Sequence, residues 1–170
     1  MVVSRQIPSR QHLPHGIPSW VPMGACYFIT ICATPKGRNQ LTVPTVARGI
    51  AESFMFNANR RVWWLELLLI MPDHLHALMK FPPEPGIGKA ISDCKHYLAR
   101  TQDIEWQRDF FEHRLRNDEN RMAKAHYIRM NPVRSGLVCA PEEWPFVWTF
   151  GSTGECSNPR PGRIARGVGS

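Results

Sequence analysis

The sequence predicts an α+β fold, because segments with the apolar pattern of strands alternate along the chain with segments that have the apolar pattern of helices. Runs rich in β-branched and aromatic residues predict strands, and apolar residues three or four apart predict amphipathic helices. The predicted order is strand, helix, strand, strand, helix, strand, helix. The first six elements match a ferredoxin-like split β-α-β sheet, in which the first and third strands are central neighbours. The last helix, which carries Tyr127, is an addition to this fold.

The first half of the chain supplies three strands and one helix. Residues 26–33 are β-branched and aromatic, which predicts the first strand. Pro44 can begin a helix that extends to about residue 60. The Pro-Asp pair at 72–73 predicts a tight bend between strands at 65–71 and 74–81. The residues of the helix that we expect to face inward are Val46, Ile50, Phe54 and Phe56.

The second half alternates helices with one short strand. A Pro/Gly loop leads into a helix at 89–101, and the middle of 106–116 predicts a fourth strand of mixed polarity. Asn117 and the following Asp are good N-cap residues for a helix at 119–130, which we expect Pro132 to end. The aromatic segment 144–148 is expected to pack back on the core.

Composition describes a basic globular protein. With 170 residues, 43% of them hydrophobic, the chain suits a single domain with a real core. We expect a cytoplasmic protein without a membrane contact, because no apolar run approaches the roughly 20 residues that cross a bilayer and no signal peptide is evident. The net charge of +7 favours an anionic partner, with nucleic acid the first candidate.

Three regions differ in composition. Residues 1–24 are rich in proline, arginine and histidine and predict an extended basic arm. Residues 25–150 contain every predicted helix and strand. Residues 151–170 are dominated by glycine, proline, serine and arginine, which predicts a disordered tail.

A histidine pair, His74 and His76, lies in the third predicted strand. Alternate residues of a strand share a face, so both imidazoles should point the same way while Leu75 and Ala77 pack on the other side. Two imidazoles on a rigid strand form half of a metal site. A bare His-x-His is also found as ordinary sheet histidines, so the pattern needs a partner elsewhere in the chain.

A second pair, Tyr127 and Asn131, lies on the last predicted helix. A spacing of four residues brings both side chains to one face, one turn apart. One helix would then supply a nucleophile and a third metal ligand. A helical tyrosine is more often part of a core, so this spacing alone leaves both interpretations open.

Several motifs occur together in a fixed order. They are Met71-Pro72 before His74-Leu-His76, Trp106-Gln107, the stretch from Phe110 to Arg116, the stretch from Tyr127 to Val138, and Trp144-Pro145. Together they resemble the single-tyrosine HUH transposases, and specifically the REP-associated tyrosine transposases, over about residues 20–150. In this resemblance Leu75 is the hydrophobic residue between the two histidines of the HUH motif.

The resemblance implies an enzyme that cleaves and rejoins single-stranded DNA near hairpin repeats. It makes residues 25–150 the catalytic domain and Tyr127 the nucleophile that forms a 5′-phosphotyrosine. It also makes His74, His76 and Asn131 the ligands of a divalent metal that polarises the scissile phosphate. Mixed nitrogen and oxygen ligands suit Mg²⁺ or Mn²⁺, although His-x-His alone would suit Zn²⁺ better.

Further residues are candidates for DNA contact and for activating the phenol. Lys124, one turn before Tyr127, is a candidate to activate it. The basic arm, the loop at 35–39 and the basic face of the second predicted helix are expected to hold phosphates. The candidate DNA-binding residues are Arg5, Arg10, Lys36, Arg38, Lys89, Lys95 and Arg116.

Two other functions fit parts of the pattern. A catalytically inactive repeat-DNA-binding protein would keep the fold without turnover. A water-using metallohydrolase would need further His or Asp ligands at motif spacing, and the remaining histidines show no such arrangement. Relatives in the resembled family include monomers and dimers, and the REP-associated group favours a monomer.

Overall fold

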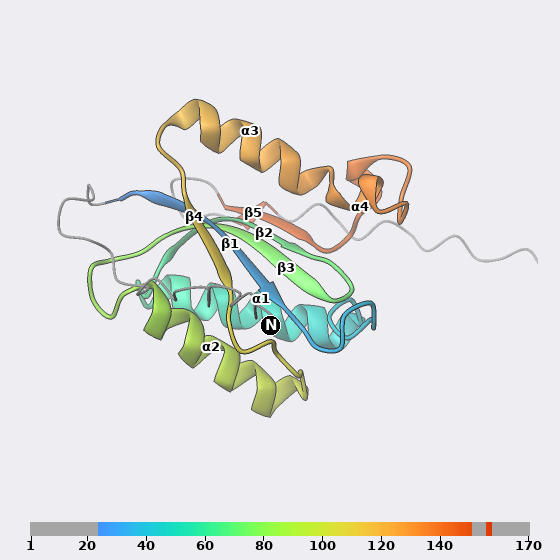
Figure 1. The fold of residues 1–170 in the computed structure, drawn as a ribbon, viewed down its shortest axis with the longest axis horizontal. Coiled ribbons are helices and arrows are strands. Elements are labelled where there is room, and N and C mark those ends of the chain that lie inside the picture. The colour runs from blue at the N-terminus through green and yellow to red at the C-terminus, as the bar shows by residue number, and fades with distance from the viewer. Residues whose placement is uncertain (1–23, 151–155, 158–170) are drawn as a thin grey trace, which may run out of the picture.

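The structure, a computed structural model, describes residues 24–150 and 156–157 (Figure 1). Its elements begin in the predicted order, and the α+β class is confirmed. Within the described residues, no helix is long and apolar enough to cross a membrane. The elements are β1 (Cys26–Cys32), α1 (Pro44–Asn59), β2 (Trp64–Ile70), β3 (His74–Lys80), α2 (Ile87–Gln102), β4 (Phe111–Arg114), α3 (Asp118–Arg129), α4 (Asn131–Arg134), the 3-10 turn η1 (Pro141–Glu143), β5 (Val147–Phe150) and β6 (Cys156–Ser157).

The strands form one sheet in the order β4-β1-β3-β2-β5-β6, with antiparallel neighbours. Strands β1 and β3 are adjacent in the centre of the first four strands, as the predicted arrangement requires. Their register pairs Thr30 with His76 and Cys32 with His74. The histidine strand is therefore held on both sides by backbone hydrogen bonds.

The C-terminal part of the sheet differs from the sequence prediction. The aromatic segment that begins at Trp144 does pack on the core, but it also continues into β5, which pairs with β2. Cys156 and Ser157 pair with β5, although this segment was expected to be part of a disordered tail. The other residues of the predicted tail, and residues 1–23 of the predicted arm, lie outside the described residues.

Helices cover both faces of the sheet. In Figure 1, α1 and α2 lie against one face and α3 lies across the other. Alternate residues of the central strands point to each side, so Ile29 and Leu75 are buried toward α1 and α2 while Phe28 and Leu78 are buried toward α3. Phe56 was expected to face inward from α1, but it is 59% exposed because it lies on the helix face away from the sheet.

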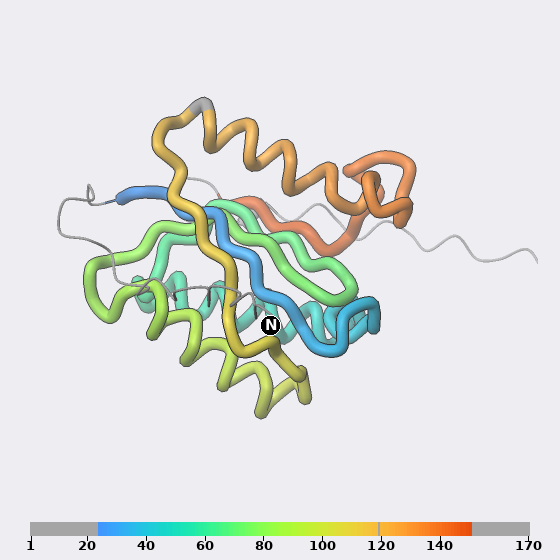
Figure 2. The backbone as a smooth tube through the Cα atoms, in the orientation of Figure 1, coloured from blue at the N-terminus to red at the C-terminus, as the bar shows by residue number. Residues whose placement is uncertain are grey.

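The turn between β2 and β3 is tied to the neighbouring loop. Figure 2 shows the connection from β1 to α1 beside this turn. The backbone N–H groups of Gln40 and Leu41 donate to the carbonyl of Pro72, and that of Ala33 donates to the carbonyl of Asp73. On the α3 side, the indole Nε1 of Trp144 donates to the carbonyl of Ile70 at 2.9 Å. These bonds fix the backbone that leads into the histidine pair.

Helix α3 begins at a side-chain cap and ends beside a second short helix. The Asn117 side chain accepts a hydrogen bond from the Asn120 backbone N–H at 2.9 Å, as the sequence predicts for an N-cap. Pro132 was expected to stop this helix, but α3 already ends at Arg129 and Pro132 lies in the first turn of α4. Proline is tolerated there because the first N–H groups of a helix have no internal partner.

Candidate functional site

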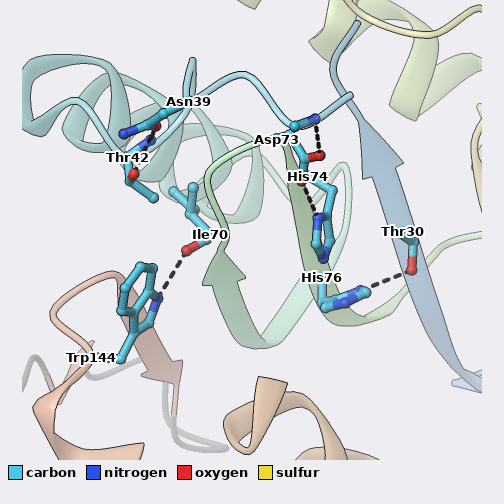
Figure 3. Close-up of polar contacts among 9 residues, drawn as sticks. Thr30, Asn39, Thr42, Ile70, Asp73, His74, His76 and Trp144 are labelled. Atoms are coloured by element: carbon cyan, nitrogen blue, oxygen red, sulfur yellow. Dashed lines mark hydrogen bonds and ion pairs between the residues drawn. The ribbon is translucent and has the colours of Figure 1, made fainter. Parts of the chain in front are cut away.

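His74 and His76 lie side by side at the start of β3, with their ring centroids 4.8 Å apart (Figure 3). Leu75 and Ala77 point the other way and are fully buried against α1 and α2. The predicted division of this strand into a histidine face and a core face is confirmed. The histidine face is the one covered by α3, because His76 packs against Phe28 at 5.2 Å between ring centroids.

Each imidazole is oriented by a hydrogen bond at its Nδ1. His74 Nδ1 lies 2.7 Å from Asp73 Oδ1, and His76 Nδ1 lies 2.9 Å from Thr30 Oγ1 (Figure 3). Both rings keep Nε2 as the nitrogen outside these bonds. A carboxylate or hydroxyl on the second nitrogen is the usual way in which proteins fix a metal-binding histidine. The geometry therefore fits a pair of imidazoles prepared for one ion.

Burial keeps His76 neutral. It lowers the pKa of His76 to about 3, with further lowering by the nearby His74 and Lys124. The neutral imidazole is the form that binds a metal. Burial would raise the pKa of Asp73, but hydrogen bonds from His74 and from the Gly37 backbone N–H outweigh it and lower that pKa below its usual value. Asp73 is then an anion that holds His74 at neutral pH.

Tyr127 lies near the end of α3, on the same side of the sheet as the histidines. Its ring meets Phe28 edge-on at 6.4 Å, and Phe28 in turn packs against His76. The tyrosine is 39% exposed, so it is not the core residue that a helical tyrosine usually is. Phe28 thus connects the tyrosine to the histidine pair, and no sequence pattern singled it out.

Two cations lie over the Tyr127 ring. The Nζ of Lys124 is 5.0 Å from the ring centroid and 4.7 Å from that of Phe28. The guanidinium carbon of Arg134, in α4, is 4.7 Å from the Tyr127 centroid. Sequence reasoning selected Lys124 from its helical spacing but gave Arg134 no role. The phenol is consequently in a strongly positive setting.

Asn131 is held at the start of α4 by its own amide nitrogen. Its Nδ2 donates to the backbone carbonyls of Tyr127 at 3.0 Å and Ile128 at 3.2 Å. These bonds orient the side chain and leave Oδ1 as its possible ligand atom. In the part of the chain that the structure describes, no three His, Cys, Asp or Glu residues gather as a metal site. Among the described residues, the candidate third ligand is therefore the amide oxygen of Asn131.

Four of the candidate DNA-binding residues are exposed. Lys36 and Arg38 lie in the loop after β1, and Arg116 lies just before α3. Lys89, at the start of α2, is also exposed and forms an ion pair with Asp93 at 2.8 Å. Arg5 and Arg10 lie outside the described residues.

Lys95 differs from its expected role. Its side chain is only 8% exposed, and its Nζ donates to the carbonyls of Gln107 and Arg108 at 2.7 and 2.8 Å. The ammonium group therefore fastens the segment after α2 to that helix and is not presented to a phosphate. The helical pattern placed Lys95 on a basic face, but the fold covers that position with the 107–108 segment.

One hollow of the described structure is separate from the histidines and Tyr127. It is a cleft of about 1120 Å³ between α3 and the β2–β5 side of the sheet, and its described lining includes Trp64, Met122 and Arg129 but neither histidine nor Tyr127. His74 is half-buried and Tyr127 is exposed, whereas His76 is buried.

The fold is similar to that of a solved structure. A solved structure of a REP-associated tyrosine transposase bound to a REP hairpin matches it with a TM-score of 0.67 and 21% identity, covering 81% of each chain. No family model matches the sequence.

Sequence relatives belong to the same family. A protein of Haemophilus influenzae assigned as a REP-associated tyrosine transposase is 26% identical over 141 residues, covering 72% of this chain and 78% of that protein. The REP-associated tyrosine transposase of Escherichia coli is 22% identical over 126 residues, covering 72% of this chain and 75% of that protein. The chain is a homologue of the REP-associated tyrosine transposases.

Proposed function

We propose that this protein cleaves and rejoins single-stranded DNA near hairpin repeats, with Tyr127 as the nucleophile and a divalent metal held by His74, His76 and Asn131. The observation that carries the proposal is the contact series from Tyr127 through Phe28 to His76. It joins an exposed phenol to two oriented imidazoles on one face of the sheet. The homology to REP-associated tyrosine transposases supports DNA as the substrate.

The proposed reaction exchanges one ester bond for another. The Tyr127 phenol oxygen attacks a backbone phosphorus, the bond from phosphorus to the 3′ oxygen breaks, and a 5′-phosphotyrosine forms with a free 3′ hydroxyl. The phenol loses its proton and the departing 3′ oxygen gains one. The energy of the broken bond is kept in the new ester, so a 3′ hydroxyl can later attack the phosphotyrosine and rejoin the strand.

The metal residues fit a divalent ion by their donor atoms. His74 and His76 offer two Nε2 atoms, and Asn131 offers Oδ1, which together make a mixed nitrogen and oxygen set that suits Mg²⁺ or Mn²⁺. A bound ion would supply charge that polarises the scissile phosphate. Thr30 and Asp73 keep the imidazoles oriented, and burial keeps His76 in its neutral form.

The direct test is a cleavage assay on a single-stranded oligonucleotide that carries a hairpin repeat from the source genome, with Mg²⁺ or Mn²⁺. Wild type is compared with Tyr127→Phe, His74→Ala and a control, Tyr97→Phe, which changes an exposed tyrosine on α2. Denaturing gels retain any covalent protein–DNA adduct. We expect an adduct from wild type and Tyr97→Phe and none from the other two variants.

Two outcomes would replace the proposal. Hairpin binding without cleavage in either metal would favour a catalytically inactive repeat-DNA-binding protein. Cleavage that persists in Tyr127→Phe but is lost in His74→Ala would favour a metallohydrolase that uses water.

We expect the active species to be a monomer, which sedimentation of the protein–hairpin complex tests against a dimer.

A further inference from the structure

Two positively charged side chains lie close to the Tyr127 ring. Lys124 and Arg134 come from two different helices, α3 and α4, and both reach the same ring at 5.0 and 4.7 Å. A single cation over an aromatic ring at an exposed site gains only a small stabilisation. A second cation near the first adds repulsion, so packing alone does not explain why both groups converge here.

No carboxylate whose position the structure describes pairs with either cation. Among the ion pairs of the described residues, Lys80 and Arg121 share Glu66, and Lys89 pairs with Asp93. Lys124 and Arg134 take part in none of the ion pairs among the side chains described in residues 24–118, 120–150 and 156–157. They therefore retain a local charge that an anion can complement.

The two cations also differ in how they are presented. Lys124 is half-buried between α3 and the sheet, where it lies over Phe28 as well as Tyr127. Arg134 is exposed at the surface, with its guanidinium carbon 4.7 Å from the centroid of the Tyr127 ring. A guanidinium has a planar set of donors that matches two phosphate oxygens, and it remains charged at every working pH. Arg134 is thus the better placed of the two to meet an incoming backbone phosphate.

We propose that Arg134 and Lys124 form a cationic clamp that holds the scissile phosphate beside the Tyr127 oxygen, with Arg134 as the group that contacts the phosphate directly. This inference rests on the proposed strand-cleaving function and adds two residues to its site. In the forward step the clamp stabilises the negative charge on the phosphate while the bond from Tyr127 forms and the bond to the 3′ oxygen breaks. In the reverse step the same charge holds the phosphotyrosine for attack by a 3′ hydroxyl.

The test separates charge at the phosphate from support of the fold. Adduct formation is measured in single turnover for wild type, Arg134→Gln, Arg134→Lys and Lys124→Gln. The control is Arg48→Gln, which removes an exposed positive charge from α1 on the opposite face of the sheet. Hairpin affinity is measured separately, and each variant is tested on a normal oligonucleotide and on one with a neutral methylphosphonate at the scissile position.

We expect Arg134→Gln to slow adduct formation by about 10²–10³-fold at saturating hairpin, the usual cost of losing one transition-state donor. Arg134→Lys should recover part of the rate because it restores the charge without the planar donors. Lys124→Gln should lose less, about 10-fold, and Arg48→Gln should match wild type. On the methylphosphonate oligonucleotide, the ratio of the wild-type rate to the Arg134→Gln rate should be smaller, because the phosphate charge that Arg134 offsets is absent.

Each contrary result has a clear meaning. If wild type forms no adduct at all, the proposed function fails and the clamp fails with it. If wild type reacts and Arg134→Gln reacts at the same rate, the clamp is refuted while the proposed function stands. If Arg134→Gln is slow on both substrates to the same extent, with a lowered melting temperature, Arg134 only supports the joint between α3 and α4 and the clamp is wrong.

Discussion

The buried His76 should make the protein lose stability in mild acid. Its pKa is about 3 in the folded chain and near 6.5 when unfolded, so between these values the unfolded state binds a proton that the folded state excludes. The free energy of unfolding therefore falls as pH falls through this window. From pH 7 to pH 5 the loss from this one group is about 2 kcal/mol, and over the whole window it approaches about 5 kcal/mol.

The measurement is denaturant unfolding at pH 7 and pH 5, in the presence of a chelator, for wild type and His76→Gln. The variant is less stable at both values, but only wild type should show the additional loss of about 2 kcal/mol. Asp73 titrates below this interval, because its pKa is lowered from 3.8. An identical pH dependence in the two proteins would refute the burial of a neutral His76.

Three substitutions test the packing that supports the site, and Lys89→Met is the control for the first of them. Lys95→Met should lower the free energy of unfolding by about 1–3 kcal/mol, because two backbone carbonyls lose their donor. Lys89→Met removes only an exposed ion pair and should change it by less than about 0.5 kcal/mol. Equal melting temperatures of the two variants would contradict this prediction. Trp144→Phe removes the bond to Ile70 and should cost about 1 kcal/mol in chemical unfolding. Asn117→Ala removes the N-cap of α3, so the free energy of unfolding should fall by about 1 kcal/mol. Amide hydrogen exchange in the first turn of α3 should also become faster, and unchanged exchange would contradict the capping role.

The strand and helix order could be predicted from sequence because each element carries a local signal. The β-branched run of β1, the proline that begins α1 and the asparagine that caps α3 act within a few residues of the structure they specify. The shared face of His74 and His76 follows from strand alternation in the same way. These features need no knowledge of long-range pairing.

Other parts of the site depend on contacts between distant segments. Thr30 orients His76 only because β1 and β3 pair in one particular register, and Phe28 reaches Tyr127 only because α3 crosses that face. Arg134 approaches the ring because α4 begins immediately after α3. The burial of Lys95 likewise depends on a loop that no helical periodicity reveals. Local patterns selected the candidates His74, His76, Tyr127 and Asn131, whereas the residues that position them required the fold.

The most direct test of the central claim is to locate the covalent bond. The adduct formed on a hairpin oligonucleotide is digested with nuclease and protease, and its peptides are sequenced by mass spectrometry. We expect the nucleotide remnant on the peptide that contains Tyr127, attached through its 5′ phosphate, and a free 3′ hydroxyl on the released strand. A remnant on another residue, or cleavage with no covalent remnant on the protein, would contradict the assignment of Tyr127 as the nucleophile.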